Sequence, residues 1–174
     1  MTLNDALIHA RRMVDAGAAI IDVGGESTRP GAAPVSVNQE LQRVIPVIEA
    51  IAAELPVVIS VDTRKLEVMR AAVAAGAGMI NDISALRGED ALLVAAQLEV
   101  PVCLMHMQGE PHTMQAAPYY ADVVMDIRMF LAERVAACEQ AGILRERLLV
   151  DPGFGFGKNV EHNLQLLKHI DAFR

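Results

Sequence analysis

Five apolar segments of this chain end in polar residues that can form hydrogen bonds with a ligand. These residues are Asp22, Asp62, Asn81 with Asp82, His106 and Asp151. An isolated Asp behind an apolar run is commonly a helix N-cap or a turn residue. A whole series of such residues is harder to explain in that way. Carboxylates and a carboxamide together offer many acceptors and one donor pair, which complements a flat heterocycle whose guanine-like edge carries several N–H groups.

The stretch DVGGESTRPGA, residues 22–32, places glycines, hydroxyls and a guanidinium directly behind the first apolar run. Its three glycines indicate a mobile loop at the end of a buried segment. Thr28 and Arg29 suit the recognition of a phosphate or a carboxylate better than they suit a plain turn. We therefore expect this loop to reach over a bound anion.

A second glycine-rich segment, DPGFGFGK at residues 151–158, has the composition of a phosphate-binding loop. It fits neither GxxxxGK[ST] nor GxGxxG, so a nucleotide site is weakly supported. Its glycines predict instead that the backbone passes close to a ligand. Only 4 Phe occur in the chain, and because Phe154 and Phe156 both lie here, we expect them to stack on that ligand. The alternative is that both rings fill the rim of the fold.

No metal site is predicted from the histidines and cysteines. His106 and His112 are six residues apart, which is not a zinc-ligand spacing, and no cysteine completes a set. His106 is interpreted as a hydrogen-bonded residue at a strand end. Met105 and its neighbouring methionines are interpreted as adaptable packing.

The apolar runs have the composition of strands that are covered on both faces. They are rich in Val, Ile and Leu and do not alternate apolar with polar residues, as half-exposed antiparallel strands do. We expect strands at residues 18–23, 56–62, 77–83, 100–107 and 147–153. Helical patterns separate these strands, which predicts βα units and a parallel sheet.

The helical patterns have recognisable ends. Ser36 and Gln39 have the spacing of a capping box, and Pro46, inside the same segment, should kink that helix. Glycines follow several segments as C-terminal caps. Helices are expected over residues 4–16, from 36, between 63 and 76, and over 89–98, 119–141 and 159–170.

Two α/β architectures compete, an open doubly wound sheet and a TIM (β/α)8 barrel. A doubly wound sheet gathers its ligand at one crevice, whereas a barrel collects side chains from many strand ends on one face. Polar residues follow every predicted strand, which favours the barrel. A whole barrel takes about 250 residues. The 174 residues supply five strands of eight, so we expect a fragment that forms one partial barrel domain, residues 1–174.

Composition limits the classes of partner. The formal charge of −7 argues against a broad nucleic-acid surface, and charged residues interrupt every apolar stretch before it reaches the length of a membrane helix. Cys103 and Cys138 show no CxxC pattern and are expected to be reduced thiols. We expect a cytoplasmic protein that binds small molecules.

Five motifs, taken together and in order, resemble dihydropteroate synthase, most closely the enterobacterial type. They cover essentially the whole chain, and the combination is far more specific than any one of them. The motifs are DVGGESTRPGA (22–32), SVDT (60–63), INDI (80–83), CLMHMQG (103–109) and DPGFGFGK (151–158).

The resemblance implies a pterin-binding barrel that condenses 6-hydroxymethyl-7,8-dihydropterin diphosphate with 4-aminobenzoate to 7,8-dihydropteroate and pyrophosphate, in folate biosynthesis. It also implies Mg²⁺ as cofactor, a homodimer at full length, and a sulfonamide target. Asp62 and Arg29 would be catalytic. The substrate-binding residues would be Asp22, Thr28, Asp62, Asn81, Met105, Asp151 and Phe156.

The chain departs from the family pattern in what it lacks. The first-strand motif with the Asn that binds Mg²⁺ is absent, and so are the later Ser-Arg-Lys and Arg-x-His segments. Two other functions stay open: a methyltetrahydrofolate-binding corrinoid methyltransferase domain, and a non-catalytic pterin-binding remnant.

Overall fold

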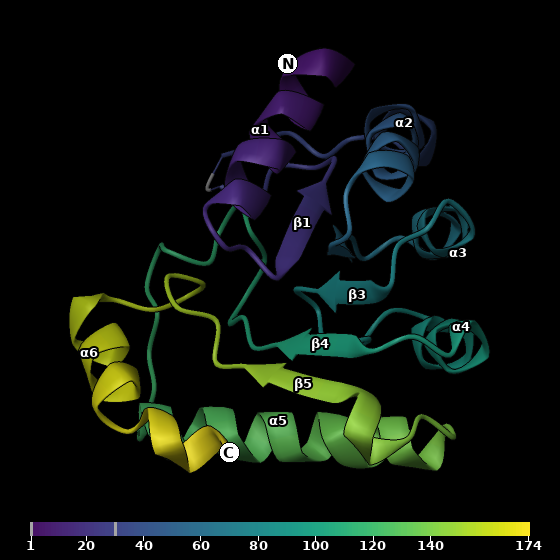
Figure 1. Ribbon diagram of the computed structural model, residues 1–174. Coiled ribbons are helices and arrows are strands. Elements are labelled where there is room, and N and C mark those ends of the chain that lie inside the picture. Colours follow the sequence, from purple (N-terminus) through teal and green to yellow (C-terminus); the bar gives the residue numbers. More distant parts are fainter. Residues whose placement is uncertain (1, 30) are drawn as a thin grey trace.

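The computed structural model describes residues 2–29 and 31–174. Its centre is one sheet of five parallel strands, which lie in the order β1-β2-β3-β4-β5 (Figure 1). The strands are β1 (Ile20–Gly24), β2 (Val58–Asp62), β3 (Met79–Asp82), β4 (Val102–Met105) and β5 (Leu148–Asp151). All five predicted strands and their parallel pairing are confirmed.

Within the described residues, six α-helices accompany the strands, and two short 3₁₀ helices lie at Arg145–Arg147 and Ile170–Phe173. Thr2, Ser36 and Asn159 each form a capping box at the start of a helix, as the spacing of Ser36 and Gln39 predicted for α2. The helices are α1 (Leu3–Asp15), α2 (Val37–Glu54), α3 (Leu66–Ala74), α4 (Ala91–Leu98), α5 (Val123–Gln140) and α6 (Val160–Lys168).

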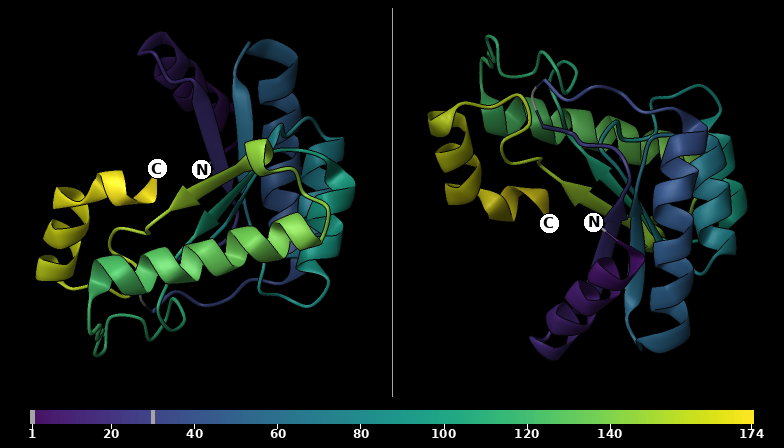
Figure 2. Two further views of the ribbon diagram at one scale, coloured as in Figure 1. Left: turned by 90° about the horizontal axis from the view of Figure 1, so that it is seen from below. Right: turned by 90° about the horizontal axis from the view of Figure 1, so that it is seen from above.

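The helices are arranged as in a barrel and not as in a doubly wound sheet. Every strand pairs with the next strand in the chain, and successive helices from α1 to α6 contact one another in the same order. Figure 2 shows α2, α3 and α4 together on one side of the sheet. A doubly wound sheet reverses its strand order and carries helices on both faces. The predicted partial (β/α)8 barrel is therefore confirmed, and the sheet is not closed within the described residues.

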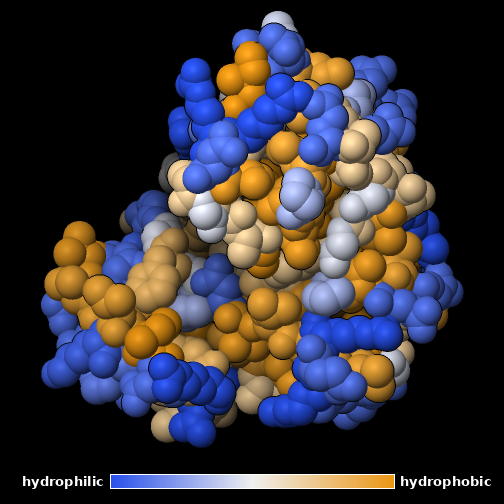
Figure 3. All heavy atoms as spheres, viewed as in Figure 1, coloured by the Kyte–Doolittle hydropathy of each residue, from blue (hydrophilic) through white to orange (hydrophobic). Residues whose placement is uncertain are grey.

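The two faces of the sheet have different surroundings. Residues such as Ile21, Ile59 and Ile80 face the helices and are at most 3% exposed, and they share one hydrophobic core with Val44 and Ile48 of α2. The other face is the inside of the open barrel. Its side chains include Ile20, Val58 and Leu149, which are 43–47% exposed, and Figure 3 shows hydrophobic residues at the surface over the middle of the sheet.

The element ends differ from the predicted ones by a few residues. The strands are shorter than the apolar runs, and α5 begins at Val123 and not at residue 119, because Asp122 accepts hydrogen bonds from the amides of Val124 and Met125. Helix α2 continues through Pro46 without interruption. Among the described residues, no helix has both the length and the apolar character needed to cross a membrane.

Candidate active site

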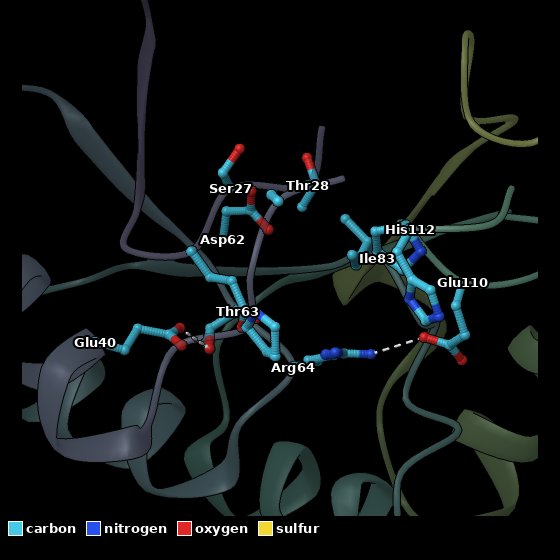
Figure 4. Close-up of a pocket in the computed structure, with 13 residues that line it drawn as sticks. Ser27, Thr28, Glu40, Asp62, Thr63, Arg64, Ile83, Glu110 and His112 are labelled. Carbon is cyan, nitrogen blue, oxygen red and sulfur yellow. Dashed lines mark hydrogen bonds and ion pairs between the residues drawn. The ribbon is translucent and has the colours of Figure 1, made fainter. Parts of the chain in front are cut away.

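A pocket of about 150 Å³ opens at the carboxyl ends of β1 and β2 (Figure 4). Most of its wall comes from three segments, the loop after β1, the residues after β2 and the loop after β4, and Glu40 of α2 and Ile83 after β3 complete it. The pocket is lined by Glu26, Ser27, Thr28, Ala32, Pro34, Glu40, Asp62, Thr63, Arg64, Ile83, Glu110, Pro111 and His112. Arg64 donates to Glu110 at 3.0 Å, which joins the second segment to the third at the rim.

Asp22, Asp62 and Asn81 lie together on the inner face of the sheet. The side-chain amide of Asn81 donates to Oδ2 of Asp22 at 3.3 Å, across the intervening strand β2. Asp62 is the register partner of Asn81 on β3 and of Gly24 on β1. The three side chains therefore form one group of acceptors with a single amide donor, as the strand-end pattern predicted.

Asp62 is the most perturbed carboxyl group of this site. Its pKa is raised from 3.8 to about 7, chiefly because burial disfavours its charged form. The negative charges of Asp22, Asp82, Glu40 and Glu26 raise it further. A carboxyl group whose pKa lies near neutral pH can exchange a proton, and a cation placed beside it would strongly favour its charged form.

Asp151 occupies the end of β5, beside Met105 of β4 in the sheet register. One of its carboxylate oxygens accepts a hydrogen bond from the amide of Gly153 at 2.7 Å. This contact is that of an ordinary turn residue. Asp151 thus has a structural role in addition to any contact with a ligand.

Asp82 and His106, also noted at strand ends, face away from the pocket. The carboxylate of Asp82 is fully buried and accepts hydrogen bonds from the amides of Ser84 and Leu86, so it holds the turn after β3. The ring of His106 packs edge-on against Phe130 of α5, with centroids 4.9 Å apart. The prediction of a hydrogen-bonded residue at a strand end is confirmed, because the His106 ring lies 3.1 Å from the Lys158 ammonium. Its side chain points out of the barrel, because it follows the inward-facing Met105.

Met105 and Phe156 belong to a small apolar cluster at the strand ends. Its other members are Ile83, Met107 and Met114, and each of the four buried residues is at most 8% exposed. Ile83 also lines the pocket. The cluster therefore forms an apolar wall next to the polar group on the inner face.

Two predicted site residues lie in the loop after β1, and they have different surroundings. Thr28 lines the pocket, whereas Arg29 is exposed and its amide lies 3.4 Å from the Ser27 hydroxyl. Among the predicted site residues, Thr28 and Asp62 line this pocket. The remaining ones lie on the inner face, in the apolar wall or on the exposed loop.

The glycines of residues 151–158 serve the fold more directly than a ligand. A Cβ on Gly153 would lie 2.0 Å from the carbonyl oxygen of His106, and one on Gly157 would lie 2.6 Å from that of Gln108. Both have positive φ. The close approach predicted for a ligand is thus an approach to the chain's own backbone at these two positions. Phe154 is 41% exposed.

The buried Lys158 also holds the segment of residues 151–158 in place. Its ammonium, in a residue only 3% exposed, donates to the carbonyl oxygens of Phe156 and His106 and lies 3.1 Å from Nδ1 of His106. Burial lowers the pKa of Lys158 to about 8, and burial with the nearby Lys158 and Arg87 lowers that of His106 to about 3. His106 is consequently neutral and accepts from Lys158.

The pocket also has polar neighbours that were not among the predicted site residues, and four of them contact one another: Glu26, Glu40, Thr63 and Lys65. Lys65 forms ion pairs with both Glu26 and Glu40, and the Thr63 hydroxyl donates to Glu40. One sequence feature could have revealed Glu40. It stands on the apolar side of α2, four residues before the buried Val44, and it is 1% exposed.

The Mg²⁺ implied by the resemblance has no complete set of ligands here. Within residues 2–29 and 31–174, no three His, Cys, Asp or Glu side chains gather as they do around a metal ion. Cys103 and Cys138 are free thiols, as predicted, and burial raises the pKa of both.

Comparison with known proteins points to one family. Residues 1–174 match the pterin-binding enzymes. The dihydropteroate synthase of Escherichia coli K12 is 59% identical over 172 residues, which are 99% of this chain and 61% of that protein. The Yersinia pestis dihydropteroate synthase in a sulfonamide drug complex has a TM-score of 0.95 at 54% identity, over 97% of this chain and 62% of its own.

A Xanthomonas albilineans dihydropteroate synthase with 4-aminobenzoic acid has a TM-score of 0.91 at 56% identity, over 97% of this chain and 59% of its own. The chain thus spans about three fifths of the length of the relatives it matches.

Proposed function

Because the chain belongs to the family of pterin-binding enzymes, we propose that it carries the pterin-binding part of a dihydropteroate synthase. The reaction joins 6-hydroxymethyl-7,8-dihydropterin diphosphate to 4-aminobenzoate and releases pyrophosphate. The observation that carries the proposal is the group of Asp22, Asp62 and Asn81 on the inner face, next to an apolar wall and an open pocket.

The polar group fits the edge of a pterin. That edge carries ring and amino N–H donors, which the carboxylates of Asp22, Asp62 and Asp151 would accept, while the Asn81 amide would serve a ring acceptor. Met105 and Phe156 would cover the flat face of the ring system. Thr28 and Arg29, on the loop after β1, would approach the diphosphate and the aminobenzoate.

The chemistry proposed for the site replaces one bond by another. The carbon–oxygen bond between the exocyclic methylene and the diphosphate breaks, and pyrophosphate leaves with the electron pair. The amine of 4-aminobenzoate then forms the new carbon–nitrogen bond and loses a proton. Asp62, partly buried, would stabilise the positive charge that develops at the pterin, an effect whose loss typically costs about 3 kcal/mol.

Mg²⁺ and a homodimer stay predictions, since they rest on the resemblance alone. Both substrates are proposed for this chain because similar proteins are pterin-binding enzymes and one is described with 4-aminobenzoic acid. A corrinoid methyltransferase gains no support from these relatives.

A chimera tests the proposed function. This chain would replace the corresponding 172 residues of the E. coli relative, to which it is 59% identical, and pyrophosphate release would be measured with both substrates. We expect turnover that D62N lowers by about 100-fold. A folded chimera without turnover that still binds 6-hydroxymethylpterin would make the chain a binding module, and one without either activity would overturn the proposal.

A further inference from the structure

Glu40 is a carboxylate in the interior, at the wall of the pocket. It is 1% exposed and lies on the side of α2 that otherwise carries Val44 and Ile48. Figure 4 shows it reaching from the helix toward Thr63, the residue that follows Asp62. A buried carboxylate costs several kcal/mol unless it is paired and hydrogen-bonded, so its contacts demand an explanation.

Helix α2 also holds the start of the loop that follows β1. Arg43 donates to the carbonyl oxygen of Gly25 at 2.8 Å, and a Cβ on Gly25 would lie 2.8 Å from both Glu40 and Val44. No residue larger than glycine therefore fits between the loop and the helix without a shift. The loop leaves the sheet from a fixed point.

Glu26, the next residue, joins the two ends of this loop. Its carboxylate lies 3.4 Å from the amide of Val35, which immediately precedes the N-cap of α2. Ser27, Thr28 and Arg29 thus belong to a segment that is closed at its base by Glu26 and Val35. The position of this base therefore determines where Thr28 and Arg29 lie relative to the pocket.

Lys65 connects this base to the helix. Its ammonium forms ion pairs with both Glu26 and Glu40, and its amide donates to the Thr63 hydroxyl at 3.2 Å. Burial acts to lower the pKa of Lys65, but the hydrogen bonds that it donates to both carboxylates, and their negative charges, raise the pKa above its ordinary value of 10.5, so the group stays charged. Among the described residues, Lys65 is the cation paired with these two carboxylates.

We propose that Lys65 is a positioning residue, which fixes the base of the loop at Glu26 to the buried Glu40 and thereby places Thr28 and Arg29 over the bound substrate. The proposal rests on the proposed function for the identity of that substrate, but not for the contacts of the loop base. Lys65 acts through Glu26 and Glu40 and is not required to touch the reacting atoms.

The same ion pairs affect the charge around Asp62. The negative charges of Asp22 on β1, Asp82 on β3, Glu40 on α2 and Glu26 in the loop all act on that carboxyl group. Lys65 neutralises part of this charge through its ion pairs with Glu26 and Glu40. Arg64 is paired with Glu110, and His112 also lines the pocket. Removal of Lys65 and removal of Glu40 should therefore act on Asp62 in opposite directions.

The first experiment needs no ligand. Amide hydrogen exchange of residues 26–35 would be compared in the wild-type chain, E26Q, K65M and K65R, with K168M as the control at an exposed lysine of α6. We expect exchange in the loop to rise at least 10-fold in E26Q and K65M, and to stay near wild type in K65R and K168M. E26Q keeps the buried pair of Glu40 and Lys65, so it stays folded even if K65M does not. Unchanged exchange of the loop in E26Q would overturn the proposal.

The second experiment measures binding of 6-hydroxymethylpterin by calorimetry from pH 5.5 to 8.5. The ionised form of Asp62 accepts from the pterin, so affinity should rise as pH rises through the midpoint. We expect the pH at the midpoint of this rise in affinity to be higher in K65M and lower in E40Q than in the wild type. A shift in the same direction in both would reduce Lys65 to a structural role and overturn the proposal. Absence of pterin binding by the wild-type chain would contradict the proposed function instead, and the exchange experiment would still decide the role of Lys65.

Discussion

Asp62 is a carboxyl group surrounded by other carboxyl groups, and its environment should be measurable in the stability of the chain. Its pKa is about 7 in the folded state against 3.8 in the unfolded one. The folded state therefore holds a proton between these values that the unfolded state releases, and the free energy of unfolding falls as pH rises through this window. At pH 8 the charged side chain opposes folding.

D62N removes this penalty. The quantity to compare is the free energy of unfolding of D62N minus that of the wild type. We expect this difference to be about 2–3 kcal/mol larger at pH 8 than at pH 5. Urea unfolding at the two pH values gives the comparison, with D171N at an exposed site as the control. A gain of equal size at both pH values would contradict the raised pKa.

Asp151 has two roles that one substitution can separate. Asn at this position keeps an oxygen for the amide of Gly153, which Asp151 bonds at 2.7 Å. Its NH₂ group, however, would face the donors of the pterin edge. We expect D151N to fold normally and to bind a pterin about 2–4 kcal/mol more weakly. Calorimetry measures this, and unchanged affinity would leave Asp151 as a turn residue only.

Sequence reasoning succeeded for residues whose position follows from a strand end. Asp22, Asp62 and Asn81 were predicted to converge because carboxyl ends of parallel strands share one edge. Lys65 and Lys158 were not predicted, because their significance depends on burial and on partners far away in the chain, Glu26 and His106 respectively. A lysine in a turn looks the same whether it is solvated or buried.

At the scale of elements, the segment from β5 to α6 depends on single glycines. Gly153 and Gly155 both have positive φ, at +69° and +81°, but only Gly153 lies against backbone, and nothing lies within 4 Å of a Cβ on Gly155. A substitution at Gly155 therefore tests backbone strain alone, whereas one at Gly153 tests backbone strain together with steric overlap.

We expect G155A to cost about 1–2 kcal/mol of stability, the price of a left-handed conformation for alanine. G153A adds an overlap with the carbonyl of His106 and should cost on the order of 3 kcal/mol or more, or displace Phe156 and Lys158. Thermal or urea unfolding of both variants gives the values. Equal losses would show that the segment moves freely away from β4.

Element boundaries were predicted less well than the elements, for identifiable reasons. The run VPVCLMHM, residues 100–107, predicted a longer strand than β4. The amide of His106 still donates to the carbonyl of Asp151, but the next residue along β5 is Pro152, which has no N–H to continue the ladder. The end of β4 is therefore set by its pairing with β5, which the apolar composition of residues 100–107 does not reveal.

At the scale of the whole molecule, the sheet leaves two strands with one unpaired edge each. Grooves of about 720 Å³ lie along both, one between β1, α1 and α2 and the other between β5 and α5. Inner-face residues such as Ile20 and Leu149 are 45% and 43% exposed. Unprotected apolar edges are templates for pairing, and exposed apolar surface disfavours a monomer by about 25 cal/mol per Å².

We expect the isolated 174-residue chain to associate with itself and to show little or no synthase turnover. Light scattering of the purified chain checks the association, and a coupled assay of pyrophosphate release checks the turnover. I20K and L149K should shift the distribution toward the monomer, because each places a charge beside an open edge, whereas L164K on the exposed side of α6 should not. A monodisperse wild-type monomer with normal turnover would contradict this expectation.

The consecutive strand order also has a consequence for how the chain is made. From β2 onward, each strand pairs with the one synthesised just before it, Val58 with Ile20, Met79 with Ser60, Val102 with Ile80 and Leu148 with Val102. None of the four strands from β2 to β5 has to wait for a first partner that is translated later. On the ribosome, every new strand and helix can therefore dock on a sheet edge that is already present, and the acceptors of Asp22, Asp62 and Asn81 would be assembled before the residues from Asp151 onward emerge.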